Sequence, residues 1–320
     1  GNAGQGGNNG ITVYSAGTGD PVTGVFATGG GTISMTGTAN GPSNYGNGSH
    51  GIFVSGDRSQ VQSTAAITLT GYGIANGVGS QNSDGVAVLS GASIVTTANG
   101  AIQITGTGGG TLANPLDQSG YGVFVDSNAV VEAAGAGSVS ITGTMGVANG
   151  IFDLNFTRFT NGAIRADSTG VRVTGGGQIV TNSGPLTIVG NGNAVGNEAF
   201  SAYGVFIANS GSAVRSTTGN ISITGTGGGT EEGRAGGDTF GVFLFDHATV
   251  STGGAGTVQL TGTGGLTSGG VSIGVEVFNN SAVSAVDGSI TLNGTGGQSS
   301  NTFAGWDKPY ANHGVELGSD

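Results

Sequence analysis

The chain has 320 residues, of which 71 are glycine, and charged residues make up only 8%. Glycine is therefore about 22% of the chain, against a usual share of about 7%. The absence of cysteine excludes a disulfide scaffold, and no apolar run reaches the roughly 18 residues of a transmembrane helix. The formal net charge of −11 argues against nucleic-acid partners, because few cations are available to neutralise phosphates.

A repeating unit accounts for most of the chain. Each unit opens with a glycine followed by alternating Val, Ile or Leu, a pattern of period 2 that predicts a short strand. Successive opening glycines lie between 33 residues (Gly241 to Gly274) and 48 residues (Gly122 to Gly170) apart. The opening glycines are Gly10, Gly51, Gly85, Gly122, Gly170, Gly204, Gly241, Gly274 and Gly314.

Two further apolar segments follow in each unit. The second lies around Val61, Ile94, Val130, Ile179, Val214, Val250 and Val283. The third alternates apolar and polar residues and in most units ends at a glycine. It occurs at Ile33–Met35, Ile67–Leu69, Ile102–Ile104, Val139–Ile141, Leu186–Ile188, Ile221–Ile223, Val258–Leu260 and Ile290–Leu292.

Three strands in fixed order predict an all-β fold, a parallel β-helix (β-solenoid) with three short strands per turn and about nine turns. One unit cannot bury its apolar face alone, whereas stacked units share a continuous core. An array of β-sandwiches is the alternative. Because adjacent strands lie ~4.8 Å apart, the rod would be roughly 40 Å long. We expect residues 1–320 to form a single solenoid domain that belongs to a longer array or stacks end to end.

The residues of the unit also suggest a family. The succession of Gly-Val-x-Val, Val-x-Ser/Thr and Ser-Ile-Thr-Leu-Thr-Gly-Thr-Gly-Gly, from Gly10 to Leu317, resembles the repeats of giant bacterial surface exoproteins. These are haemagglutinin-like β-helical adhesins, similar to filamentous haemagglutinin, although the present repeat is longer. No secretion domain of that family lies within these residues. The resemblance implies an extracellular or cell-surface fibre, adhesin or matrix component.

The variable position in the first strand predicts an interaction face, because its flanking apolar neighbours point inward and it points outward. The face consists of Phe53, Phe124, Arg172, Phe206 and Phe243. Four exposed phenylalanines on one side would form a contact site for another copy or a neighbouring surface protein. The alternatives are a purely structural ladder or a patch covered by the chain's own loop.

A long insertion at residues 145–169 could provide that cover. It contains Ile151, Phe152, Leu154, Phe156 and Phe159, and a loop this apolar should pack on something.

A second unusual loop holds Trp306, Asp307 and Tyr310. Aromatic rings beside polar groups can stack on sugars, so this loop is a candidate contact for a cell-surface polysaccharide. Its alternative role is to cover the edge of the rod.

The outward positions of the third strands carry many threonines, such as Thr68, Thr70, Thr105, Thr142 and Thr224. A flat threonine array can order water, as ice-binding solenoids do. Threonine also simply favours strands.

Carboxylates are scattered along the chain. Asp57, Asp126 and Asp246 follow first strands and could approach one another, while Glu231 and Glu232 share a loop with Asp238. Calcium in such loops is an alternative to solvated turn acids. Polysaccharide cleavage would need two carboxylates that face each other, for which Glu276 and Glu316 are the nearest candidates.

The sequence therefore predicts a structural or adhesive extracellular fibre that associates laterally or end to end. We expect no enzymatic activity, no cofactor, no metal and no membrane insertion within this segment. A polysaccharide-binding or polysaccharide-cleaving β-helix is the alternative function, and an ice- or calcium-binding solenoid is a minor one.

Overall fold

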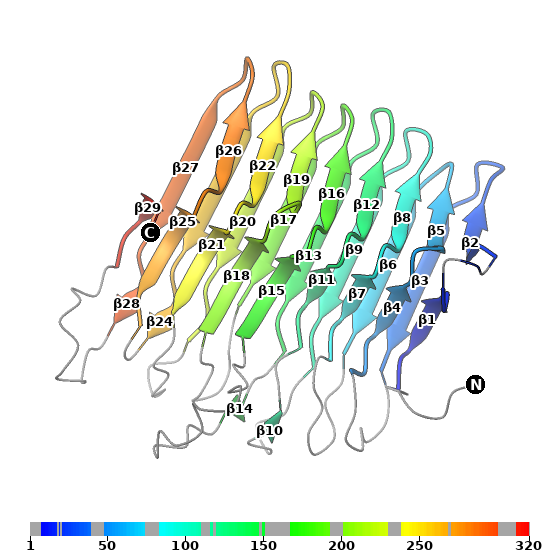
Figure 1. Ribbon diagram of the computed structural model, residues 1–320, viewed down its shortest axis with the longest axis horizontal. Helices are drawn as coiled ribbons and strands as arrows, with labels where there is room; N and C mark the ends of the chain where they lie inside the picture. Colours follow the sequence, from blue (N-terminus) through cyan, green and yellow to red (C-terminus); the bar gives the residue numbers. More distant parts are fainter. Residues whose placement is uncertain are drawn as a thin grey trace.

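The computed structural model describes residues 8–17, 19, 21–39, 48–73, 83–109, 116–117, 120–146, 149–150, 167–192, 201–229, 238–267, 270–299 and 312–319. Strands of three parallel sheets follow one another in strict order along the chain, so each pass through the three sheets is one turn of a β-solenoid (Figure 1). The predicted all-β parallel β-helix with three strands per turn is confirmed.

The first sheet has nine strands, and the other two have eight each. The first sheet contains β1 (Ile11–Tyr14), β4 (Ile52–Ser55), β7 (Val86–Leu89), β11 (Val123–Val125), β15 (Asp167–Val173), β18 (Ser201–Ala208), β21 (Thr239–Phe245), β25 (Ser272–Phe278) and β29 (Val315–Gly318). The second contains β2 (Thr23–Ala27), β5 (Ser59–Ser63), β8 (Ser93–Thr96), β12 (Val130–Ala133), β16 (Gln178–Thr181), β19 (Ala213–Ser216), β22 (Thr249–Thr252) and β26 (Ala282–Ala285). The third contains β3 (Ile33–Thr38), β6 (Ile67–Tyr72), β9 (Ile102–Thr107), β13 (Val139–Thr144), β17 (Leu186–Asn191), β20 (Ile221–Thr226), β23 (Val258–Thr263) and β27 (Ile290–Thr295).

The described strands thus make eight complete turns and the first strand of a ninth, slightly fewer than the nine turns expected. Two pairs of short strands lie outside the three sheets. β10 (Leu116–Asp117) pairs with β14 (Asn149–Gly150) antiparallel, and β24 (Leu266–Thr267) pairs with β28 (Gln298–Ser299) in parallel. Among the described residues, no helix is long and apolar enough to cross a membrane.

The second sheet differs from the sequence prediction at two strands. The repeat pattern missed β2, whose Val25 pairs in register with Val61. In β12 the inward residue is Val131, which pairs with Ile94 and Ile179, while Val130 lies on the outer side. Because Val130 and Val131 are both valines, the sequence does not indicate which of the two faces the core.

One continuous core runs along the axis, because inward Val, Ile and Leu side chains stack turn upon turn. Ile52, Leu69, Ile104, Ile141 and Ile188 are fully buried. Burying such a side chain is worth roughly 1.5–3 kcal/mol, so each turn contributes to holding its neighbours. All eight third-sheet strands predicted from the sequence pair in the expected register.

Glycine closes the corner between the third and first sheets. Gly143 in β13 lies so close to Gly170 in β15 that a Cβ atom on Gly143 would collide with the Gly170 carbonyl oxygen. The same contact joins Gly106 to Gly122 one turn earlier. Only a residue without a side chain permits this close approach of two backbones.

Candidate interaction face

The outward position of the first sheet forms a single column along the rod. Strand register aligns each residue with its counterpart in the next turn, as the alternating pattern predicted. The column reads Thr12, Phe53, Ala87, Phe124, Arg172, Phe206, Phe243, Glu276 and Glu316. The register therefore brings the five predicted face residues together, and their binding role stays a prediction.

The expectation that all four phenylalanines are exposed is wrong. Phe206 is only 9% exposed, and Phe53, Phe124 and Phe243 are half-buried. The cause is a second column, three residues earlier in each turn, whose side chains pack against the first. The ring centroids lie 4.9 Å apart for Tyr121 and Phe124.

The same pairing recurs in neighbouring turns. The ring centroids of Tyr203 and Phe206 lie 5.2 Å apart, and those of Phe240 and Phe243 lie 4.5 Å apart. Together with Ile273 these rings form a hydrophobic cluster outside the main core. We call Phe53, Phe124, Phe206 and Phe243, with the rings that pack on them and Arg172, the aromatic face.

Arg172 lies inside the aromatic face. Its guanidinium carbon is 5.0 Å from the ring centroid of Tyr121 and 5.1 Å from that of Phe206, both within cation–π range. Its Nη1 donates a hydrogen bond of 3.1 Å to the Tyr121 hydroxyl. Its Nε is buried without a hydrogen-bond partner in the described part of the chain. The planar guanidinium therefore joins the aromatic residues of the preceding turn to those of the following turn.

Arg172→Lys should lower the free energy of unfolding by about 1 kcal/mol, because an ammonium keeps the charge but loses the flat stacking surface. Chemical denaturation of the purified chain measures this change. Arg215→Lys is the matched control, since Arg215 is exposed on the second sheet. Equal effects of the two substitutions would contradict a stacking role for Arg172.

Two carboxylates follow the aromatic face toward the end of the described chain. Glu276 is 7% exposed, and its Oε2 has no hydrogen-bond partner among the described residues. Burial, and then the charges of Glu316 and Asp238, raise the pKa of Glu276 to about 8. Glu316 pairs in register with Glu276, and its Oε2 lies 2.8 Å from His313 Nδ1. The side chain of Glu276 is thus almost entirely covered by the protein.

Sequence reasoning missed a polar group at the other end of the rod. His50 is 8% exposed, its ring stacks on Phe53 at 4.8 Å, and its Nδ1 lies 3.1 Å from Oδ2 of the fully buried Asp84. Asp84 Oδ1 accepts a hydrogen bond from the backbone N–H of Tyr121. His50 and Asp84 directly precede the opening glycines Gly51 and Gly85. Aligning the residues that precede the opening glycines would therefore have placed His50 and Asp84 at equivalent positions of neighbouring turns.

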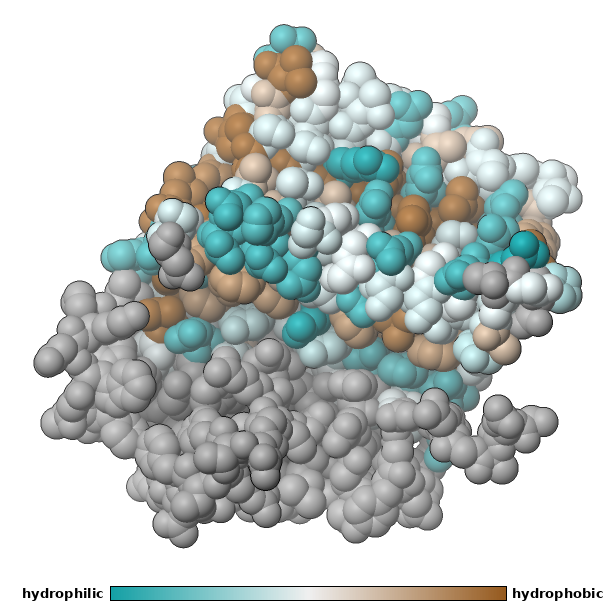
Figure 2. Space-filling view, in the orientation of Figure 1, coloured by the Kyte–Doolittle hydropathy of each residue, from teal (hydrophilic) through white to brown (hydrophobic). Residues whose placement is uncertain are grey.

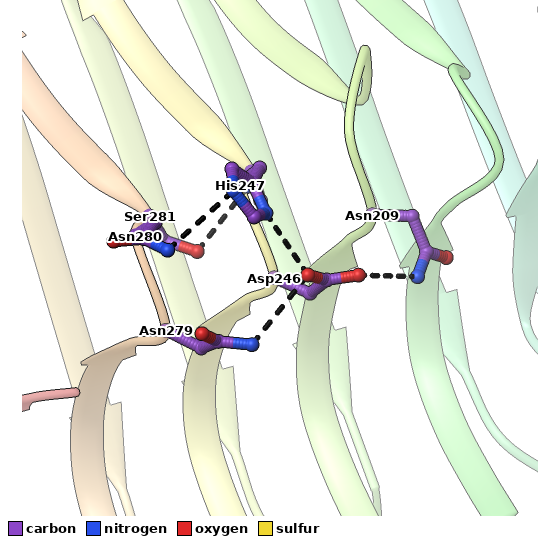
Figure 3. A network of polar contacts seen from close by, with 7 residues as sticks. Asn209, Asp246, His247, Asn279, Asn280 and Ser281 are labelled. Carbon is purple, nitrogen blue, oxygen red and sulfur yellow. Dashed lines mark hydrogen bonds and ion pairs between the residues drawn. The ribbon is translucent and has the colours of Figure 1, made fainter. Parts of the chain in front are cut away.

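The turn acids do not converge on a shared site. Asp246 Oδ1 lies 2.9 Å from His247 Nδ1, and Asp246 Oδ2 accepts a hydrogen bond from Asn209 (Figure 3). These contacts hold the pKa of Asp246 below its usual value, with His247 as the larger cause. Asp246 and His247 both have positive φ, a backbone conformation that Asp, Asn and His tolerate better than most residues. This network therefore stabilises the stacked turns.

Asp126 makes separate contacts, with Ser127 and with the Thr174 hydroxyl. Within the described ranges, no group of three or more His, Cys, Asp or Glu residues could hold a metal ion.

Several predicted elements lie outside the described residues. They are Trp306, Asp307 and Tyr310, the pair Glu231 and Glu232, and residues 151–166 of the predicted insertion. The predicted end of the insertion at residue 169 overlaps β15, which begins at Asp167.

Exposed apolar side chains gather along the last strands. Val286 is 72% exposed, Leu317 is 66% exposed and Ile290 is 44% exposed. Figure 2 shows hydrophobic residues in brown along the edge where β27 and β29 lie in Figure 1. At the equivalent positions of the preceding turn, Val258 is 1% exposed and Val277 is 9% exposed, because another turn covers them.

Comparison with known proteins identifies no relative, since no protein family, no curated protein and no solved structure matches this chain. The fold alone therefore assigns the protein to a class. It is a parallel β-solenoid, and its first sheet bears the aromatic face.

Proposed function

We propose that this chain is a stretch of an extracellular bacterial surface fibre, a stiff rod that spaces and presents contact surfaces. The observation that carries the proposal is the unbroken parallel register of three sheets through eight turns. Because the hydrogen bonds between parallel strands run along the rod axis, bending or stretching the rod strains many bonds at once. Such a structure suits a mechanical role.

The sequence resemblance to haemagglutinin-like β-helical adhesins supports an extracellular location and an adhesive role. The composition agrees with it, since a cysteine-free chain needs no control of thiol oxidation outside the cell. The partners proposed are further copies of the chain or neighbouring surface proteins.

The aromatic face is the proposed lateral contact. Phe53, Phe124 and Phe243 are half-buried and leave part of each ring open to a partner. Aromatic residues and arginine are enriched at protein interfaces, and burying their remaining surface would favour association. End-to-end stacking of rods is the second proposed mode of association.

Replacing Phe53 and Phe124 together by serine should weaken lateral association, because the half-open rings then no longer bury apolar surface. Sedimentation velocity and electron microscopy of the purified chain measure the loss of paired rods. Phe26→Ser is the control, since Phe26 is 47% exposed on the second sheet, away from the aromatic face. Unchanged association of the double variant, or equal loss in the control, would refute a lateral contact at this face. If the parent chain and the double variant capture polysaccharide equally well, any sugar contact lies outside the aromatic face.

A further inference from the structure

The third sheet carries a regular outward face of small polar residues. Each of its eight strands presents three outward positions, and strand register aligns them in three columns. The columns are Ser34, Thr68, Gln103, Ser140, Thr187, Ser222, Gln259 and Thr291; then Thr36, Thr70, Thr105, Thr142, Val189, Thr224, Thr261 and Asn293; then Thr38, Tyr72, Thr107, Thr144, Asn191, Thr226, Thr263 and Thr295. We call these 24 positions, eight strands with three each, the hydroxyl face.

The composition of the hydroxyl face differs from that of the second sheet. Serine or threonine fills 18 of its 24 positions, six in each column, and none of the 24 is charged. The second sheet, by contrast, presents Glu132 and Arg215 outward. None of the 24 residues is buried, so the face is open to solvent along the described rod.

The same local geometry repeats along the hydroxyl face. Five strands carry the sequence Thr-Gly-Thr, in which the threonines point outward and the glycine forms the tight corner with the first sheet. In β13 these residues are Thr142, Gly143 and Thr144. Threonine is branched at Cβ and therefore has few rotamers on a strand. The hydroxyl and methyl groups of successive turns should accordingly repeat in the same orientation.

The spacing of the hydroxyl face favours ordered water. Neighbouring strands are ~4.8 Å apart, and outward residues on one strand repeat about every 6.6 Å. Hydroxyls at these separations are too far apart for direct hydrogen bonds. One water molecule can bridge the shorter separation, and two linked water molecules are needed for the longer one. The middle-column threonines make no side-chain hydrogen bonds to other described residues, so their hydroxyls are available to water. The backbone thus imposes a two-dimensional lattice on the first water layer.

The composition of the face argues against a second protein chain as its occupant. A stable protein interface centres on aromatic or aliphatic anchors. The hydroxyl face offers only Tyr72 and Val189 as large apolar groups. A regular array of uncharged hydroxyls is instead suited to a partner that is itself a regular, uncharged array of hydrogen-bonding molecules.

We propose that the hydroxyl face of the third sheet binds ice, with Thr36, Thr105, Thr142, Thr224 and Thr261 in its central column. The strand spacing and the rise of two residues along a strand set the two repeat distances that an ordered water layer on this face would follow. Threonine methyl groups exclude disordered water between the rows, while the hydroxyls anchor the ordered layer. This activity does not depend on association through the aromatic face, because the two faces lie on different sheets.

The test is ice affinity and thermal hysteresis of the whole chain. The parent chain should be incorporated into a slowly growing ice hemisphere and should shape single ice crystals. The variant Thr105→Tyr, Thr142→Tyr, Thr224→Tyr should lose both properties, because three large rings break the flat surface. Tyrosine already occupies an outward position at Tyr72, which is 43% exposed, so the fold accommodates such a ring. Circular dichroism and thermal melting verify that the variant is folded.

The matched control carries Gln62→Tyr, Glu132→Tyr and Ser251→Tyr on the outer side of the second sheet. It should retain the ice incorporation of the parent chain. The proposal is overturned if the parent chain is excluded from ice, or if the third-sheet variant and the control lose incorporation equally. A less disruptive second variant, Thr142→Ser with Thr224→Ser, removes only methyl groups and should weaken ice shaping without unfolding the chain. Full retention of ice shaping in both third-sheet variants would also overturn the proposal.

Discussion

Gly143→Ala should lower the free energy of unfolding by at least about 2 kcal/mol, the cost typical of forcing an extra group into a packed interior. The added Cβ would collide with the Gly170 carbonyl, and that atom belongs to backbone in the middle of the rod. Neither β13 nor β15 can move away, because each is paired with strands on both sides. Urea denaturation followed by circular dichroism measures the change.

The control for this substitution is Gly29→Ala. No atom lies within 4 Å of the position that a Cβ would take at Gly29. Its replacement should therefore leave stability unchanged or raise it slightly, since alanine restricts the unfolded chain. Similar stabilities for the Gly143 and Gly29 variants would show that the corner between the first and third sheets is not closely packed.

Glu276→Gln should remove a loss of stability that the parent chain suffers as the pH rises. The pKa of Glu276 is raised to about 8 from an ordinary value of 4.5, with burial as the main cause and the charges of Glu316 and Asp238 as further causes. Between these two values the folded chain binds more protons than the unfolded chain. The contribution of Glu276 to stability therefore falls as the pH rises through this window, by at most about 1.4 kcal/mol per pH unit, and levels off above it.

A glutamine at this position stays neutral, so the variant should match the parent near pH 5 and exceed it in stability at pH 8 to 9. Melting temperatures recorded across this range measure the difference. Glu132→Gln, which removes an exposed carboxylate from the second sheet, is the control for the loss of one carboxylate. Parallel pH profiles for the parent and the Glu276 variant would contradict the buried, unpaired state of this carboxyl.

The fold could be predicted from the sequence because its signal is local and repeated. Each third-sheet strand, such as Ile102–Thr107, alternates inward and outward residues with period 2, and eight copies confirm one another. The glycines that opened each unit also had a structural cause, since Gly122 and Gly170 lie where two sheets meet closely. Repetition supplied the evidence that a single short strand lacks.

The aromatic face could be predicted only in part. Alternation placed Phe124, Arg172 and Phe206 in one column, as the register shows. It did not reveal that Tyr121 and Tyr203 pack over that column, because a pattern of period 2 assigns residues three positions apart to opposite faces. The burial of Glu276 and of Asp84 was also missed, because alternation does not show what packs over an outward position.

Cryo-electron microscopy of native filaments tests most directly the claim that this chain is a stretch of a stiff surface fibre. We expect continuous rods with an axial repeat of ~4.8 Å, the distance between stacked strands. Neighbouring rods should touch through the side that bears Phe53, Phe124 and Arg172. Isolated particles without an axial strand repeat, or filaments joined only through the second sheet, would contradict it.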